Sequence, residues 1–123
     1  MGKNIIIGAS INPKRYSNIA AKLLIQNDED ITLIGNKEGE ILNHPITKEL
    51  PAIEKTDSIM LYLRAENQSP YYTFILNSKP DRVIMNPGSE NPELMALCQE
   101  KGITVICGCS ILMSRAEQAR KVK

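Results

Sequence analysis

The feature that most constrains the fold is a series of five short apolar runs, each almost continuously hydrophobic. Strands that are hydrophobic at consecutive positions are typical of parallel sheets that helices cover on both faces. Segments with helical signals separate the runs, and this alternation predicts an open α/β sheet with right-handed crossovers. The predicted parallel strands are Ile5 to Ile7, Ile31 to Ile34, Ile59 to Leu63, Val83 to Met85 and Ile103 to Cys107.

Three segments between these runs carry helix signals. The first helix is expected to have Ser17 as its N-cap and to end near Asn27. The second opens on Ser69-Pro70, with Ser69 as the N-cap, and stops before Lys79-Pro80. The third opens on Asn91-Pro92-Glu93 and ends at Lys101-Gly102, where glycine can adopt the left-handed closing conformation.

The segment from Gly35 to Asp57 has mixed signals. Turn residues occur at Asn36, Gly39 and Asn43-His44-Pro45, so we expect at most one short strand or helical turn there. The whole pattern predicts one Rossmann-like domain over residues 1–123, a doubly wound and mainly parallel five-stranded sheet with helices on both faces.

Composition narrows the class of protein. A chain of 123 residues, 42% apolar and 24% charged, can build a core without disulfides or metals. A net charge of only +1 argues against a nucleic-acid partner. The apolar run near the N-terminus is too short for a signal sequence or a membrane span, so we expect a cytoplasmic protein. Three cysteines without knuckle spacing predict neither a disulfide nor a zinc site.

The loop between the first strand and the first helix, GASINPKRYS at residues 8–17, is the main candidate for function. It lies where open α/β sheets bind ligands, beyond the carboxyl end of the first strand. Backbone amides and the positive end of a helix dipole suit a phosphate or pyrophosphate there. Gly8 permits a close approach, Ser10 and Ser17 offer hydroxyl groups, and the Arg15 guanidinium matches a phosphate edge. The loop therefore predicts an anion site.

This loop departs from the dinucleotide fingerprint G-x-G-x-x-G. The three glycine positions hold Gly8, Ser10 and Pro13. The fingerprint also expects a carboxylate after the second strand, but this strand continues as Gly35-Asn36-Lys37. A cation at Lys37 disfavours NAD and favours a ligand with an additional phosphate on its ribose.

Longer stretches of the chain resemble a known family. The runs GASINPKRYSNIAAKLL, GNKEGEIL and SIMLYLR, with Gly88 and Cys109, resemble the small stand-alone CoA-binding domain proteins, a bacterial family related to the CoA-binding domain of succinyl-CoA synthetase. The resemblance implies a Rossmann-like domain whose first loop binds the CoA pyrophosphate and whose second-strand loop approaches the adenosine 3′-phosphate. The residues that it implies for CoA or acyl-CoA binding are Gly8, Ala9, Ser10, Asn12, Arg15, Tyr16, Ser17, Lys37 and Arg64.

Two places depart from the pattern of that family. It usually has Asn-Pro after the second strand, where this chain has Gly35-Asn36. Its usual tryptophan-glutamine region is replaced by Ile84-Met85-Asn86-Pro87. Both changes fall at the expected cleft and would reshape the adenine or pantetheine side of the site. Asn36, Asn86 and Gly88 therefore join the expected ligand-binding residues.

Some chemically capable residues have simpler interpretations. His44, the only histidine, is expected in a turn rather than as a catalytic base. The run GASIN at residues 8–12 lacks the second glycine of a G-x-S-x-G nucleophile elbow. Cys107 and Cys109 are expected to be buried, with a thiol near the reactive end of the ligand as the alternative.

Other positions keep two interpretations. Arg64 either lines the cleft or forms an ion pair with a carboxylate such as Glu66. Tyr16 either lines the pocket or packs as a hydrophobic staple at the helix start. Ile111-Leu112-Met113 is a packing segment or a homodimer contact.

The sequence shows no base paired with a nucleophile, so it predicts a non-catalytic protein that binds CoA or acyl-CoA. Two alternatives stay open. One is a protein like an NADP-dependent oxidoreductase, in which Lys37 meets the 2′-phosphate. The other is a vestigial nucleotide fold used for protein interaction.

Overall fold

The architecture comes from a computed structural model that describes residues 3–53, 55–113 and 115–116. Strands and helices alternate along most of this part of the chain, as the apolar runs predict. The elements, in chain order, are β1 (Lys3–Ile7), α1 (Tyr16–Gln26), β2 (Asp30–Ile34), β3 (Gly39–Ile41), β4 (His44–Thr47), β5 (Thr56–Leu61), the 3₁₀ turns η1 (Ala65–Asn67) and η2 (Ser69–Tyr71), α2 (Tyr72–Asn77), β6 (Pro80–Met85), α3 (Pro92–Glu100) and β7 (Thr104–Cys107).

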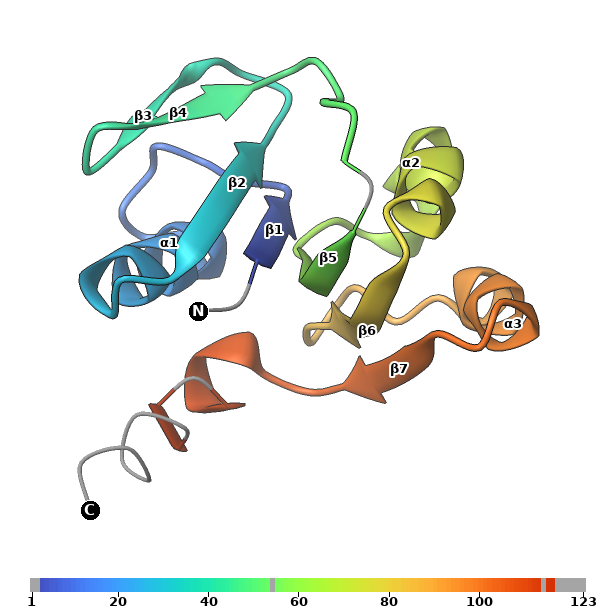
Figure 1. Ribbon diagram of the computed structural model, residues 1–123. Helices are drawn as coiled ribbons and strands as arrows, with labels where there is room; N and C mark the ends of the chain where they lie inside the picture. The colour runs from blue at the N-terminus through green and yellow to red at the C-terminus, as the bar shows by residue number, and fades with distance from the viewer. Residues whose placement is uncertain (1–2, 54, 114, 117–123) are drawn as a thin grey trace.

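The strands of the described residues form one seven-stranded sheet in the order β3-β4-β2-β1-β5-β6-β7 (Figure 1). The five strands predicted from the apolar runs are all present, and they pair in parallel. The register places Ile5 of β1 beside Thr32 of β2 on one side and Ile59 of β5 on the other. The doubly wound α/β fold is confirmed, with seven strands in place of the expected five.

The two additional strands form a hairpin in the segment where at most one short strand or turn was expected. β3 and β4 pair antiparallel, and β4 also pairs in parallel with β2. The connecting residues Leu42 and Asn43 have φ values of 47° and 69°. Two consecutive residues with positive φ make a tight turn that matches the twist of a hairpin. Because the turn contains no glycine, its sequence signal is weak.

Helices cover both faces of the sheet (Figure 1). On the face of α2 and α3, Ile5 and Ile7 of β1 belong to a buried cluster that includes Ile75 and Leu94. On the face of α1, Ile6 of β1 belongs to a second buried cluster, with Ala21 and Leu24 of α1 among its members. Successive side chains of β1 thus point to opposite faces of the sheet and contribute to both buried clusters, as expected for a central strand. No helix in the described part of the chain is long and apolar enough to cross a membrane.

The helix boundaries agree only partly with the sequence signals. Asn91 caps α3 by accepting hydrogen bonds from two backbone amides, and Gly102 has a φ of 72°, so both ends of that helix are confirmed. Ser17 is not the N-cap of α1, because the turn at Asn12-Pro13 starts the helix one residue before it and makes Arg15 the cap. Ser69 does not cap α2 either, because Ser69–Tyr71 forms a 3₁₀ turn ahead of that helix.

The segment after β7 folds back onto the α1 face of the sheet. Residues 110–113 are helical. Ile111 is buried in the cluster on that face and Met113 packs against it, whereas Leu112 is exposed. The packing interpretation of this segment is therefore confirmed, and a dimer contact stays a prediction.

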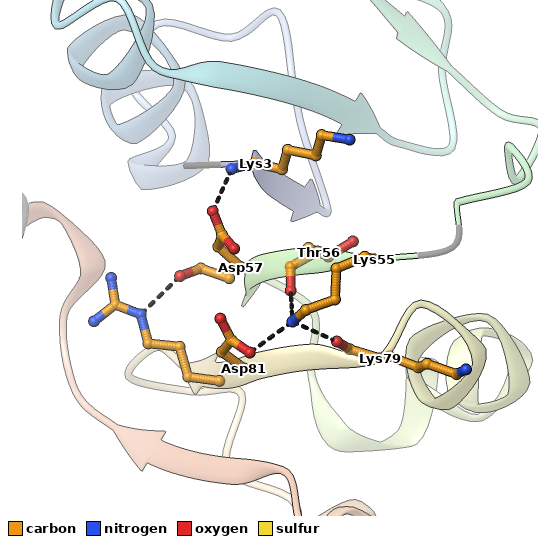
Figure 2. A network of polar contacts seen from close by, with 8 residues as sticks. Lys3, Lys55, Thr56, Asp57, Lys79 and Asp81 are labelled. Carbon is orange, nitrogen blue, oxygen red and sulfur yellow. Dashed lines mark hydrogen bonds and ion pairs between the residues drawn. The ribbon is translucent and has the colours of Figure 1, made fainter. Parts of the chain in front are cut away.

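A polar network joins the amino ends of three neighbouring strands (Figure 2). The backbone amide of Lys3 in β1 donates to Asp57 in β5. Nζ of Lys55 lies 2.6 Å from Asp81 of β6 and also donates to the backbone oxygens of Thr56 and Lys79. This network lies at the opposite end of the sheet from the candidate loop.

Candidate ligand-binding cleft

A cleft of about 790 Å³ lies beyond the carboxyl ends of the central parallel strands. This is the place where open α/β sheets bind ligands. The cleft is lined by Gly8, Ala9, Ser10, Arg15, Tyr16, Ser17, Gly35, Asn36, Lys37, Tyr62, Leu63, Arg64, Asn67, Pro70, Tyr71, Pro87, Gly88 and Ser89.

The first wall of the cleft is the loop after β1, and it is tied to the end of β2. The amides of Gly8 and Ala9 both donate to the carbonyl oxygen of Ile34, each over 2.9 Å. Gly8 has a φ of 100°, and Gly35 packs so tightly that an added Cβ would collide with the Ala9 carbonyl. Glycine is required at both positions for these reasons. These two amides are thus engaged within the protein, whereas the Ser10 amide donates to no group in the described part of the chain.

The start of α1 supplies further donors to the same wall. The chain enters the helix through an Asx turn, in which the Lys14 amide donates to Asn12 Oδ1. Arg15 is the N-cap, and among the described residues no side chain caps the helix. The amides of Tyr16 and Ser17 are therefore unpaired within the described chain. These amides and the helix dipole favour an anion.

The buried side chain of Asn18 in α1 stabilises the first wall. Its Nδ2 donates to the Ser10 carbonyl oxygen over 2.9 Å, and the residue is buried. Ser10 Oγ in turn accepts from the Asn12 amide. Hydrogen bonds to its carbonyl oxygen and to its hydroxyl thus fix the position of Ser10.

The charge of the cleft is positive. Arg15, Lys37 and Arg64 are its charged lining residues, and no carboxylate lines it as far as the described residues go. Lys37 follows β2 and Arg64 follows β5, so the parallel strands bring them to the same edge of the sheet. Arg64 has no ion pair within the described residues, which favours the cleft-lining interpretation over a pair with Glu66.

The second wall is made by the residues after β5 and β6. Tyr62 follows β5 directly, and its hydroxyl is buried without a hydrogen-bond partner in the described part of the chain. Burial raises the pKa of the Tyr62 hydroxyl to about 12. Tyr71 of η2 and Gly88, which follows β6, also line the cleft.

Ten of the twelve residues expected to bind a ligand line this cleft. Asn12 and Asn86 do not. Asn12 shapes the first loop through its Asx turn. Asn86 is buried below the cleft, where its Nδ2 donates to Leu61 O and its Oδ1 accepts from the Ser110 amide. The Asn86 side chain thus joins β5 to the segment after β7.

Sequence reasoning missed several lining residues of the second wall. Tyr62 and Leu63 carry a usable signal, because they follow a central strand at its carboxyl end. Ser89 carries none beyond its place in a turn, and Asn67 and Pro70 depend on how the two 3₁₀ turns fold.

The remaining candidates lie outside the cleft lining. His44 is the first residue of β4, directly after the turn at Leu42 and Asn43, with Nδ1 3.0 Å from the Leu42 carbonyl oxygen, so it lies in a strand rather than in the expected turn. The expected burial of Cys107 and Cys109 is wrong, since Cys107 is exposed and Cys109 is half-buried. The reason is that β7 is an edge strand, which has no neighbour on its outer side. The described residues contain no group of three His, Cys, Asp or Glu side chains that could hold a metal ion.

A second cavity, of about 430 Å³, lies at the amino ends of β1, β2 and β5. Its lining combines the cations Lys3 and Lys55 with the carboxylate of Asp30. Lys55 is already paired with Asp81. Charge and donor geometry therefore select the cleft at the carboxyl ends as the candidate functional site.

The fold and the cleft together define a Rossmann-like α/β protein with a cation-lined cleft at the carboxyl ends of its strands. Comparison with known families gives the particular class: the chain belongs to the CoA binding domain family, whose model matches residues 3–115. The resemblance seen in the sequence is confirmed. No curated protein matches the chain.

Solved structures agree with this assignment. The chain is similar to a crystal structure of an uncharacterized protein, with 39% identity, a TM-score of 0.90, and coverage of 95% of this chain and 97% of that one. It also shares its fold with a protein from Thermus thermophilus (16% identity, TM-score 0.82, coverage 94% and 89%). A hypothetical protein from Pyrococcus horikoshii OT3 has the same fold (20% identity, TM-score 0.83, coverage 94% and 82%).

Proposed function

We propose that this protein binds CoA or acyl-CoA in the cleft without catalysing a reaction on it. The observation that carries the proposal is the charge of the cleft, which has three cations and no carboxylate among its described lining residues. A ligand with several phosphates matches such a lining. Membership of the CoA binding domain family supports the choice of CoA among such ligands.

The unpaired donors suggest how the pyrophosphate is held. The amides of Ser10, Tyr16 and Ser17, together with the Arg15 guanidinium, face one wall of the cleft. Of the backbone amides in residues 8–10, this set contains only that of Ser10, because those of Gly8 and Ala9 donate to Ile34. Lys37, which follows β2 and also lines the cleft, is the proposed partner of the adenosine 3′-phosphate.

The absence of catalysis is proposed from the chemistry of the lining. No histidine, cysteine, aspartate or glutamate occurs among the described residues that line the cleft. General acid–base catalysis uses histidine most often, or a carboxylate, and thiol chemistry needs a cysteine, each within hydrogen-bond reach of the reacting atoms. The cations can hold phosphates, but they give no base to move a proton.

Isothermal titration of the purified, ligand-stripped protein tests the proposal. We expect heat of binding with CoA and a weaker response to dephospho-CoA, which lacks the 3′-phosphate. The absence of any heat with CoA up to millimolar concentration would disprove CoA binding. NADP and NAD belong in the same series, because Lys37 would also suit a 2′-phosphate, and tighter binding of NADP than of CoA would favour the oxidoreductase-like alternative.

Two substitutions assign the phosphate contacts. Arg15→Ala and Lys37→Ala should each weaken CoA binding by roughly 1 to 3 kcal/mol, as expected for a charge-assisted contact. Matched controls are Lys14→Ala, next to Arg15, and Lys48→Ala, both of them exposed and outside the cleft lining. Equal weakening by a control and its partner would mean that net charge, rather than contact, governs the affinity.

A further inference from the structure

We propose that Gln68 is a positioning residue of the cleft, which holds together the two loops of the second wall without touching the ligand. The proposal rests on the proposed function for its choice of ligand. Gln68 lies between η1 and η2, is 0% exposed, and is not among the residues that line the cleft. It therefore acts through Leu63 and Ser89, the two residues to which its side chain donates hydrogen bonds.

The two donor hydrogens of Gln68 go to two different loops. Nε2 donates to the carbonyl oxygen of Leu63, in the loop after β5, and to that of Ser89, in the loop after β6, both over 2.8 Å. Arg64 and Gly88 are the immediate neighbours of these carbonyls in the cleft lining. One amide group thus sets the spacing between the two halves of the second wall.

The orientation of the Gln68 amide is fixed from outside the wall. Asn91 Oδ1 accepts from the Glu93 and Leu94 amides at the start of α3, so Asn91 can present only its Nδ2 to Gln68. That Nδ2 donates to Gln68 Oε1 over 2.9 Å and lies 2.8 Å from the Tyr72 hydroxyl. The Tyr72 hydroxyl in turn donates to Glu93. In this series of hydrogen bonds, Gln68 Oε1 already accepts from Asn91. The two hydrogens of Gln68 Nε2 therefore point to the Leu63 and Ser89 carbonyl oxygens.

The loop after β6 is anchored at its first residue, Asn86, whose side chain bonds to Leu61 and to the Ser110 amide. Beyond Asn86 the other described contacts are local: the Ser89 amide donates to the Asn86 carbonyl oxygen and the Gly88 amide donates to the Glu90 carboxylate. Gly88 has a φ of 94°, and an added Cβ would have no atom within 4 Å. Without the donors of Gln68, the buried Ser89 carbonyl and the half-buried Leu63 carbonyl lose these partners, and the loop can move outward to reach water.

Titrations of the full chain with CoA and with inorganic pyrophosphate, followed by amide NMR shifts, test the proposal. Gln68→Met keeps the side-chain length but removes the donors, and Gln99→Met, at an exposed position of α3, is the matched control. We expect Gln68→Met to weaken CoA binding at least tenfold. Pyrophosphate affinity should stay within twofold, because the first wall is intact. Amide exchange should rise at least tenfold at residues 64–71 and 87–89, apart from Pro70 and Pro87, which have no amide hydrogen.

A merely structural role gives a different result, with CoA and pyrophosphate binding falling together or exchange rising throughout the protein. Either result, or CoA affinity and wall exchange that stay within twofold of wild type, would overturn the proposal. If wild type binds no CoA, the proposed function fails, and the exchange at the two loops alone decides the role of Gln68.

Asn91→Asp provides a second variant in case Gln68→Met does not fold. The carboxylate still caps α3 but presents an oxygen to Gln68, so the Gln68 amide should flip and turn its own oxygen toward the Leu63 and Ser89 carbonyls. The expected result is the same loss of CoA affinity with pyrophosphate binding retained. Unchanged CoA affinity in Asn91→Asp, with unchanged exchange at residues 64–71 and 87–89, would also overturn the proposal.

Discussion

Gly8 and Gly35 lie where two backbone segments approach more closely than a side chain permits. A Cβ on Gly8 would lie 2.9 Å from the Tyr62 carbonyl oxygen, at a φ of 100°. A Cβ on Gly35 would collide with the Ala9 carbonyl oxygen. The backbone of β5 and of the first loop, rather than a movable side chain, is the obstacle in both cases.

Replacing either glycine should destabilise the fold. We expect Gly8→Ala and Gly35→Ala each to lower the free energy of unfolding by about 2–3 kcal/mol, from backbone strain at Gly8 and overpacking at Gly35. Gly108→Ala is the control, because an added Cβ there meets its nearest atom at 4.0 Å, and it should change stability by less than about 0.5 kcal/mol. Urea denaturation measures all three, and equal stability of the three variants would contradict the prediction.

Tyr62 gives the protein a pH dependence at high pH. Burial raises the pKa of the Tyr62 hydroxyl to about 12, against about 10 in the unfolded chain, so the unfolded state loses this proton first. Its contribution is fully present below pH 10 and is lost as the pH rises from 10 to 12. Between those values wild type should lose up to about 1.4 kcal/mol per pH unit more than Tyr62→Phe.

Denaturant unfolding at a series of pH values checks this difference. At pH 7 we expect Tyr62→Phe to lie within about 1 kcal/mol of wild type, because the hydroxyl that it removes has no hydrogen-bond partner in the described chain. Parallel stability curves for the two proteins above pH 10 would show that Tyr62 does not carry the effect.

Among the helices, α1 starts without a side-chain cap in the described part of the chain. The N-cap position is occupied by Arg15 with φ −79° and ψ 140°, a backbone conformation in which serine would cap the helix. Arg15→Ser should therefore be more stable than Arg15→Ala by about 1 kcal/mol. Both variants should lose the same part of the CoA affinity, since both lack the guanidinium.

Thermal unfolding and CoA titration of the two variants separate these effects. Lys14→Ser is the control, because it adds a serine to the same loop at a position that cannot cap the helix. Equal stabilities of Arg15→Ser and Arg15→Ala would mean that the helix start does not gain from a cap.

The sequence predicted the elements whose signals are local and strong. The run Ile5 to Ile7 could only be a strand buried on both faces, and Asn91-Pro92 could be recognised as the start of a helix. Lys37 was predicted from its place after the second strand and Arg64 from the family resemblance, and both line the cleft. For residues of these kinds, neighbours in the sequence determine the structure.

The features that the sequence did not predict depend on contacts between distant segments. The β3–β4 hairpin needs Leu42 in a left-handed conformation, which leucine rarely adopts and no sequence signal announces. The engagement of the Gly8 and Ala9 amides depends on the register of β1 against β2. The role of Gln68 depends on the loops after β5 and β6, whose Leu63 and Ser89 carbonyl oxygens accept from its side chain. In the sequence it is a polar loop residue with no distinguishing signal.

At the scale of the whole molecule, the two ends of the sheet have different roles. The carboxyl ends carry the cleft, whereas the amino ends carry the polar network of Lys3, Lys55, Asp57 and Asp81 (Figure 2). The side chains of Lys55 and Asp81 are 55% and 68% exposed, and ion pairs at such positions contribute little.

Asp81→Asn should therefore change neither stability nor CoA affinity appreciably. We expect a change of less than about 0.5 kcal/mol in the free energy of unfolding, since Lys55 keeps its bonds to the Thr56 and Lys79 carbonyl oxygens. CoA affinity should stay equal to that of wild type, because the substitution lies at the far end of the sheet. Chemical denaturation and calorimetric titration measure the two quantities, and a loss of affinity would show that the ends are coupled.

The Ile34 carbonyl, which accepts from both Gly8 and Ala9, has a kinetic consequence. A loop fastened in this way to the end of β2 has few conformations to search before a ligand can seat on it, so little entropy is lost at that step. The association rate of an anionic ligand should then be set by diffusion and by attraction to Arg15, Lys37 and Arg64. It should fall as ionic strength rises, while the dissociation rate changes much less.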